Sequence, residues 1–287
     1  MIKKGIILAG GNGTRMSPLT KAVNKQLLPI YDKPLIFYSL SILMLSKIKE
    51  VLIIVNKGQL EQYKKIIPDG NNLGMKISYK EQEKPNGLPE AFIIGETFIK
   101  KDNVALILGD NFFYGQNLSS LLLECKNLKS GAKVVLHKTN KPELYGVAQL
   151  KNNKISIIKE KPKKFISDKA ITGLYFFDNN VIKLSKKLKK SKRNELEITD
   201  LLKIYKKQNK LRFKELGRGA VWLDTGSIED FYNASSFVST IENRQGIKIA
   251  CLEEISLNNN WISKKELSQS IKFYGNCKYS NYLKTFL

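Results

Sequence analysis

The most informative segment of the chain is Gly5-Ile-Ile-Leu-Ala-Gly-Gly-Asn-Gly-Thr-Arg15, and Lys25-Gln-Leu-Leu-Pro29 follows ten residues later. The apolar run predicts a buried strand, and the glycines after it allow a turn in which backbone N–H groups face anionic oxygens. A glycine turn alone is equally typical of an ordinary strand-to-helix connection. Arg15 and Lys25 favour phosphate binding instead, because fixed cations can neutralise the charge of a triphosphate.

Two common phosphate-binding loops do not fit this segment. A dinucleotide-binding GxGxxG loop needs a glycine where Met16 stands and an acidic residue at the end of the second strand, where Asn56 stands. A Walker A loop needs Gly-Lys-Ser/Thr, whereas Gly13 is followed by Thr14 and Arg15. The segment therefore predicts nucleotide binding of a different type.

Apolar runs alternate with helical patterns through the first half of the chain. The predicted strands are Lys4–Ala9, Val51–Val55, Lys76–Tyr79, Val104–Leu108 and Ala132–His137. The predicted helices are Leu35–Lys47, Gln59–Ile66, Pro89–Phe98 and Leu118–Lys126. This alternation predicts an α/β fold with a Rossmann-like, mixed but mostly parallel sheet and helices on both faces. Such sheets bind ligands at the carboxyl ends of their strands, so Gly10–Arg15, Gln82–Gly87 and Gly109–Asn111 should gather at one edge.

The pattern changes after about residue 140. Gly146–Leu150 and Lys154–Lys159, joined through Asn152-Asn153, predict a β-hairpin. Further strands are predicted at Gly173–Phe177 and Leu211–Leu216, and further helices at Asn180–Lys190 and Ile198–Gln208. Ser227 with Asp230, and Ser263 with Glu266, resemble capping boxes at helix starts. We expect one α/β domain over residues 1–227 and a small, mostly helical C-terminal appendage over residues 228–287.

Composition limits the class of protein. The chain has 287 residues, 42% of them hydrophobic, which suffices to bury a large core. Its apolar segments are too short for a secretory signal or a membrane span. The three cysteines, Cys125, Cys251 and Cys277, show no CxxC spacing. Since free thiols are usual in reducing compartments, we expect a cytoplasmic protein with no membrane partner.

The net charge of +23 raises the question of nucleic-acid binding. Only five of the 49 basic residues are arginines, although proteins that read nucleic acids favour arginine for bidentate contacts. The densest basic run, Lys183–Arg193, and the residues before it place Val181, Leu184 and Leu188 on one helical face. That arrangement is typical of a solvated amphipathic helix. We therefore expect small anionic substrates and no nucleic acid.

Two aspartates follow apolar segments. Asp110 comes after Val104–Leu108, and Asp224 lies in Trp222-Leu-Asp-Thr-Gly226. Each alone is also typical of a turn. As a pair they suit Mg²⁺, which one or two carboxylates hold together with substrate phosphates and water.

Several motifs, in their order and spacing, resemble the sugar nucleotidyltransferases and most of all the glucose-1-phosphate thymidylyltransferases. Besides the two N-terminal segments, they are Leu108-Gly-Asp-Asn-Phe-Phe-Tyr-Gly115, Glu160-Lys-Pro162, Thr172-Gly-Leu-Tyr175, Glu195-Leu-Glu-Ile-Thr-Asp200 and Trp222-Leu-Asp-Thr-Gly226. The resemblance runs from about residue 2 to about residue 255. It implies the nucleotide-diphospho-sugar transferase fold.

The resemblance also implies a Mg²⁺-dependent enzyme that joins dTTP and α-D-glucose 1-phosphate into dTDP-glucose and pyrophosphate. In the family this is the first step toward dTDP-deoxysugars such as dTDP-rhamnose. Two alternatives stay open at this point: the same chemistry with UTP or another hexose 1-phosphate, and a nucleotide-sugar-binding protein without turnover.

The matching motif positions imply roles for individual residues. Arg15, Lys25 and Lys161 are the implied catalytic residues, and Asp110 and Asp224 are the implied metal ligands. The implied nucleotide contacts are Leu8, Gly10, Gly11, Gly13, Thr14, Arg15, Lys25, Gln82, Gly87 and Asp110. The implied sugar-phosphate contacts are Tyr145, Gly146, Glu160, Lys161, Thr172, Tyr175 and Arg193.

The resembled family forms homotetramers that an end-product dTDP-sugar inhibits at a second site between subunits. The residues implied for that allosteric site are Tyr114, Gly115 and Arg218. The aromatic run from Phe112 to Tyr114 is as typical of a local core segment as of an interface. The tail beyond about residue 256 matches the family poorly, which leaves tail-dependent regulation open.

Overall fold

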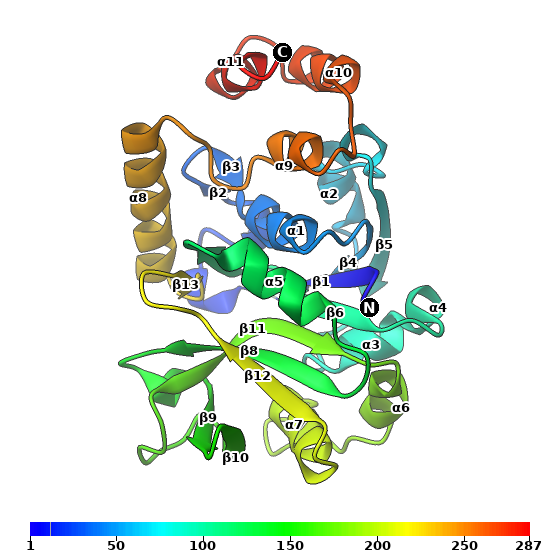
Figure 1. The fold of residues 1–287 in the computed structure, drawn as a ribbon, viewed down its shortest axis with the longest axis vertical. Helices are drawn as coiled ribbons and strands as arrows, with labels where there is room; N and C mark the ends of the chain where they lie inside the picture. The colour runs from blue at the N-terminus through cyan, green and yellow to red at the C-terminus, as the bar shows by residue number, and fades with distance from the viewer. Residues whose placement is uncertain (12) are drawn as a thin grey trace.

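The computed structural model describes residues 1–11 and 13–287, so Asn12 of the glycine-rich segment lies outside the described residues. A nine-stranded sheet forms its centre (Figure 1). The strands are β1 (Lys4–Ala9), β4 (Glu50–Asn56), β5 (Lys76–Gln82), β6 (Val104–Leu108), β8 (Ala132–Lys138), β9 (Gly146–Lys151), β10 (Lys154–Glu160), β11 (Lys169–Phe177) and β12 (Leu211–Glu215). They lie in the order β10-β9-β11-β6-β1-β4-β5, with β8 beside β11 and β12 beside β8.

The first half of the sheet is parallel and the second half is mixed. β6, β1, β4 and β5 pair in parallel, whereas β11 is antiparallel to β6, β8 and β9. β9 and β10 form the predicted hairpin, and both Asn152 and Asn153 adopt positive φ, as a two-residue hairpin turn requires. The predicted fold class is confirmed.

Helices cover both faces of the sheet. The α-helices of the described residues are α1 (Leu35–Leu45), α2 (Leu60–Ile66), α3 (Glu90–Ile94), α4 (Glu96–Ile99), α5 (Leu118–Lys126), α6 (Asn180–Lys186), α7 (Ile198–Lys207), α8 (Ile228–Gln245), α9 (Leu252–Asn258), α10 (Lys264–Tyr274) and α11 (Lys278–Lys284). Successive residues of a strand face opposite sides. Accordingly, Ile7 and Ala9 join a core with α1, α2 and α5, while Ile6 and Leu8 join a second core with α3, α6 and α7. Burial on both faces explains why β1 is apolar throughout.

Two further strands, which the sequence did not predict, form a ladder beside the main sheet. β7 (Asn111–Tyr114) pairs antiparallel with β13 (Val221–Asp224), and Asp224 lies opposite Asn111. Phe112 and Phe113 are buried in this ladder, so the aromatic run is a core segment at those two positions. Asp224 is the last residue of β13 and Asp110 directly precedes β7, so the ladder brings the two predicted metal ligands close together.

The C-terminal helices pack on the side of the sheet that α1 covers. Ala234 and Val238 of α8 share a core with Tyr38 of α1 and Phe112, and α9 packs against α1. In Figure 1 α9, α10 and α11 lie at the opposite end of the molecule from β9, β10 and α7. The Ser263–Glu266 capping box of α10 is confirmed. At the start of α8, the Ser227 hydroxyl accepts from the Asp230 N–H and donates to the Asp230 carboxylate. In a capping box that carboxylate would instead accept from the Ser227 backbone N–H. The domain boundary at residue 227 stays a prediction.

Most element boundaries agree with the sequence predictions within a few residues, with two corrections. The single helix predicted over Pro89–Phe98 is divided into α3 and α4 at Gly95. The helix predicted over Asn180–Lys190 ends at Lys186, and the remaining lysines form an irregular segment. Within the described part of the chain, no helix is both long and apolar enough to cross a lipid bilayer.

Candidate active site

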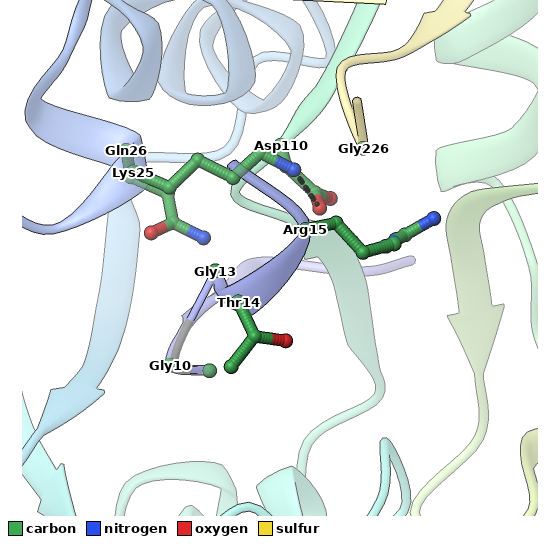
Figure 2. A pocket seen from close by; sticks show the side chains of 9 residues that line it. Gly10, Gly13, Thr14, Arg15, Lys25, Gln26, Asp110 and Gly226 are labelled. Carbon is green, nitrogen blue, oxygen red and sulfur yellow. Dashed lines mark hydrogen bonds and ion pairs between the residues drawn. The ribbon is translucent and has the colours of Figure 1, made fainter. Parts of the chain in front are cut away.

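The glycine-rich segment forms one wall of a cavity of about 240 Å³ at the carboxyl end of β1. We call it the loop cavity; its lining residues are Gly10, Gly11, Gly13, Thr14, Arg15, Lys25, Gln26, Asp110 and Gly226. Figure 2 shows Lys25 reaching the Asp110 carboxylate, while Arg15 extends from the loop on the side of Gly226. The predicted phosphate-loop residues Gly10, Gly11 and Gly13 thus lie together with both predicted catalytic cations of the N-terminal segments.

The conformation of the loop depends on glycine at two positions. Gly11 has a φ of 105°, a backbone conformation that residues with a side chain rarely adopt. A Cβ on Gly10 would lie 2.6 Å from Oε1 of Gln82 at the end of β5. The loop can therefore approach the end of β5 only because position 10 has no side chain.

The two aspartates lie side by side but differ in environment. Nζ of Lys25 lies 2.8 Å from Oδ2 of Asp110, and Nδ2 of Asn111 donates to Oδ1 over 3.0 Å. Although burial opposes its ionisation, these contacts lower the pKa of Asp110. Burial, and then the charge of Asp110, raise the pKa of Asp224 from 3.8 to about 7. Asp110 is therefore held in its ionised form, whereas Asp224 retains its proton to a much higher pH.

A second cavity, of about 300 Å³, lies on the other side of Arg15 and Asp110, which line both cavities. Of the predicted sugar-phosphate contacts, the structure places Tyr145, Gly146, Glu160, Lys161, Tyr175 and Arg193 on its wall. Asp224 and Gly87 line it as well. Residues from β6, β9, β11 and β13 line this cavity. The motifs that follow the two N-terminal segments therefore converge on one cavity, although they are far apart in the sequence.

Charged side chains form a network at the wall of the second cavity. Arg193 lies 2.6 Å from Oε2 of Glu197 and 3.5 Å from Oε1 of Glu160. Burial, and then the charge of Glu197, raise the pKa of Glu160. Lys161 has a positive φ of 40° and donates its backbone N–H to the carbonyl of Tyr145 over 3.0 Å. The backbone of Lys161 is thus held against the segment that carries Tyr145.

The segment from Gln82 to Gly87 runs from the end of β5 to the wall of the second cavity. Gln82 is buried at the end of β5, and its Nε2 donates to the carboxylate of Glu90, which also accepts from Nδ2 of Asn86 over 2.7 Å. Gly87 packs so closely on Leu196 that a Cβ would lie 2.1 Å from the Leu196 carbonyl oxygen. With Nε2 engaged by Glu90, Oε1 is the atom of Gln82 that faces the loop.

Two predicted contacts lie elsewhere. The Thr172 hydroxyl is buried and donates to the carbonyl of Val135 over 3.0 Å, because alternate residues of β11 face opposite sides. Its neighbours Ile171 and Gly173 line the second cavity instead, and the sugar-phosphate contact expected of Thr172 stays a prediction. Leu8 lies in the core beneath the loop, and its carbonyl accepts from the Gly109 N–H over 2.9 Å.

The predicted allosteric residues gather at the far end of the β7–β13 ladder. Tyr114 lies opposite Val221, Gly115 approaches Ala220, and Arg218 is exposed in the turn before β13. None of these three residues lines the loop cavity or the second cavity. Their role stays a prediction.

Two residues near the carboxylates were not singled out from the sequence. Oδ1 of Asn111 accepts from the Gly173 N–H over 3.0 Å and from Nε1 of Trp222 over 2.6 Å. A Cβ on Gly226 would lie 2.8 Å from a terminal nitrogen of the Arg15 guanidinium. Both residues belong to motifs quoted above, but their roles depend on partners far away in the sequence.

The chemistry of Asp110 and Asp224 fits a hard divalent cation. No group of three or more His, Cys, Asp or Glu with metal-site geometry occurs among the described residues. Two carboxylates beside a phosphate-type loop supply hard oxygen donors, which suit a hard divalent cation that substrate phosphates could also contact. Burial and the charge of Asp110, which raise the pKa of Asp224, oppose its ionisation, and a bound cation would favour it.

Comparison with known proteins identifies the family of the chain. The nucleotidyl transferase family profile matches residues 4–241. A glucose-1-phosphate thymidylyltransferase of Neisseria meningitidis serogroup A is 47% identical over 281 residues, which cover 98% of each chain.

Two solved structures share the fold. One, from Bacillus anthracis, is assigned as a glucose-1-phosphate thymidylyltransferase in complex with sucrose; it is 38% identical, covers 82% of this chain and 94% of its own, and has a TM-score of 0.76. The other, a UDP-glucose pyrophosphorylase complexed with UDP-glucose, is 26% identical with a TM-score of 0.73, covering 84% and 100%. The chain is a nucleotidyltransferase and belongs to the family of the glucose-1-phosphate thymidylyltransferases.

Proposed function

We propose that the chain joins dTTP and α-D-glucose 1-phosphate to give dTDP-glucose and pyrophosphate. An oxygen of the sugar phosphate forms a bond to the α-phosphorus of dTTP. The bond from that phosphorus to the oxygen that bridges to the β-phosphate breaks, and pyrophosphate leaves. The nucleophile is already an anion, so the reaction requires positioning and charge neutralisation and no general base.

The observation that carries this proposal is the sharing of Arg15 and Asp110 by two adjacent cavities. A triphosphate in the loop cavity and a sugar phosphate in the second cavity would bring their phosphates together at these two residues. In this arrangement Arg15 and Lys25 neutralise charge on the triphosphate and the departing pyrophosphate. Mg²⁺, held by Asp110 and Asp224, would supply further neutralisation of the phosphate oxygens when bound.

The sugar phosphate is assigned to the second cavity because its wall combines cations with hydroxyl-binding groups. Lys161 and Arg193 can contact the phosphate, and the Glu160 carboxylate can accept hydrogen bonds from sugar hydroxyls. Oε1 of Gln82, fixed by Glu90, can accept from a ring N–H of the base. Thymine and uracil share that N–H and differ by one methyl group, worth about 1–3 kcal/mol in a pocket. UTP is therefore the main alternative nucleotide.

Release of pyrophosphate from a panel of substrates tests the proposal. The panel pairs dTTP, UTP and dCTP with glucose 1-phosphate, galactose 1-phosphate and mannose 1-phosphate, each with Mg²⁺ and with EDTA. We expect the highest kcat/KM for dTTP with glucose 1-phosphate and loss of turnover in EDTA. Higher kcat/KM for UTP, or for another hexose phosphate, would replace the substrate pair while keeping the reaction. Binding of the nucleotide without turnover on any pair would contradict an enzymatic function.

The assembly is a separate proposal, which the family resemblance supports. We propose a homotetramer in which the appendage over residues 228–287 contributes to association and a dTDP-sugar end product, such as dTDP-rhamnose, inhibits. The placement of Tyr114, Gly115 and the exposed Arg218 outside both cavities is compatible with a second site. Light scattering at assay concentration tests the assembly, and pyrophosphate release with and without the dTDP-sugar tests the inhibition.

A further inference from the structure

Asn56, the last residue of β4, makes a two-point contact with the glycine-rich loop. The Gly11 N–H donates to Oδ1 of Asn56 over 2.9 Å, and Nδ2 of Asn56 donates to the Gly11 carbonyl over 2.9 Å. Both backbone polar groups of one loop residue are therefore bound by one side chain. Gly11 is also the residue whose φ of 105° turns the chain at the loop cavity.

A carboxamide is the side-chain group that suits this contact. It presents one acceptor and one donor on adjacent atoms, which match the N–H and carbonyl of Gly11. An aspartate would keep the acceptor but place a second oxygen against the Gly11 carbonyl. A hydroxyl side chain has a single oxygen and is too short to present two separate atoms. The identity of residue 56 is therefore tied to the conformation of the loop.

The position of Asn56 in the sheet makes this contact rigid. Ala9, two residues before Gly11, lies in β1 beside Val55, and Asn56 itself is paired with Gln82 of β5. A strand end that is hydrogen-bonded on both sides moves little, so it provides a fixed support for the loop. The same strand ends place Gln82, the proposed base contact, next to the support.

We propose that Asn56 is a positioning residue for triphosphate binding: its carboxamide holds Gly11 in the conformation that forms the loop cavity before the anion arrives. A loop that is ordered in advance loses less conformational entropy on binding. The inference rests on the proposed function only in treating the loop as the phosphate site. It requires neither dTTP as the natural nucleotide nor any turnover.

Calorimetry with inorganic tripolyphosphate at one fixed Mg²⁺ concentration tests the proposal on the intact protein. We expect a Kd about tenfold weaker for Asn56→Ala, which is about 1.4 kcal/mol. The loss should be larger for Asn56→Asp, because that variant keeps the size of the side chain but adds an anion next to a bound anion. In steady-state assays, both variants should raise the KM for the triphosphate and leave the KM for the sugar phosphate within about twofold.

Asn103 provides a matched control at the other end of the sheet. Its amide also binds backbone groups on both sides: Nδ2 donates to the carbonyls of Leu128 and Lys129, and Oδ1 accepts from the Asn179 N–H. Asn103→Ala should lower the Tm without changing the tripolyphosphate Kd, which separates loss of stability from loss of positioning.

Three results would overturn the proposal: an unchanged tripolyphosphate Kd in both Asn56 variants, an equal rise of both KM values, or an equal loss of binding in Asn103→Ala. Because Asn56 is only partly buried, we expect both of its variants to fold. Wild-type protein that binds tripolyphosphate but never releases pyrophosphate would contradict the proposed function and leave this binding test intact.

Discussion

Replacing Asp224 by asparagine should stabilise the metal-free protein while it abolishes most Mg²⁺-dependent turnover. Burial and the nearby charge of Asp110 raise the pKa of Asp224 from 3.8 to about 7. The folded protein therefore ionises this carboxyl only at a cost that the unfolded chain does not have. An amide of the same size removes that cost, and it also removes one of the two proposed metal ligands.

The size of the stabilisation follows from the pKa. The folded and unfolded pKa values differ by about 3. At about 1.36 kcal/mol for each pKa unit, this difference corresponds to about 4 kcal/mol. Because Asp224 lines a cavity and is only partly buried, solvent reduces both the cost of burial and the repulsion, and we expect about 2 kcal/mol. At about 2–4 °C for each kcal/mol, the Tm of Asp224→Asn should rise by about 4–8 °C.

The gain should depend on pH in a defined direction. Below the unfolded pKa of 3.8 the carboxyl is protonated in both states, so wild type and variant should have equal stability. Between about pH 4 and pH 7 the unfolded wild-type chain releases this proton while the folded protein keeps it, so wild-type stability falls relative to the variant. Above about pH 7 the difference should be complete and constant.

Differential scanning fluorimetry in EDTA from pH 4 to pH 9 measures this gain, and the same scans with Mg²⁺ test the ligand role. Mg²⁺ should raise the Tm of the wild type and have little effect on Asp224→Asn. Glu229→Gln, an exposed acidic residue in the first turn of α8, is the control and should change neither profile. The reasoning fails if Asp224→Asn is less stable than wild type at pH 8 in EDTA, or if Mg²⁺ stabilises both proteins equally.

Three further predictions concern Lys161 and Arg15, the glycine beside Arg15, and Arg218. Lys161→Ala should raise the KM for the sugar phosphate at least about tenfold, while Arg15→Ala should lower kcat by about 10²–10³ with the triphosphate bound; equal effects of both variants on both substrates would contradict this division. Gly226→Ala should lower kcat about tenfold with little change in Tm, because its Cβ would lie 2.8 Å from the Arg15 guanidinium. The control is Gly217→Ala, whose Cβ meets nothing within 4 Å and which should change neither kcat nor Tm. Arg218→Ala should relieve inhibition by a dTDP-sugar while turnover persists, and inhibition that stays unchanged and purely competitive with dTTP would remove the second site.

The main sheet could be predicted from the sequence because its strands are buried on both faces. Val104–Leu108 is apolar at every position, and the structure places β6 at the same bounds. Because residues on both faces of such a strand are apolar, the sequence does not show which face each residue occupies. Ile171 to Phe177 contains no regular alternation of polar and apolar residues, so nothing in the sequence shows that Thr172 faces β8 while Gly173 faces the cavity.

The supporting amides could not be predicted for a different reason. Asparagine after a strand is typical of a turn, and both Asn56 and Asn111 stand in such positions. Their roles come from contacts with residues distant in sequence, Gly11 for the first, Gly173 and Trp222 for the second. A single sequence carries no signal for contacts of this range, whereas the motifs that supply the charged groups are local.

The spacing of the two carboxylates is set by the register of the β7–β13 ladder. Asp224 lies opposite Asn111, and a shift of one residue would turn Asp224 to the other face of the ladder. Thr225 opposes such a shift, because its N–H and its hydroxyl both donate to the Asp110 carbonyl, over 3.1 and 2.8 Å. Trp222 opposes it as well, through its bond to Asn111. Trp222 and Thr225, on either side of Asp224, therefore fix the register that holds the two like charges together until a cation can bind them.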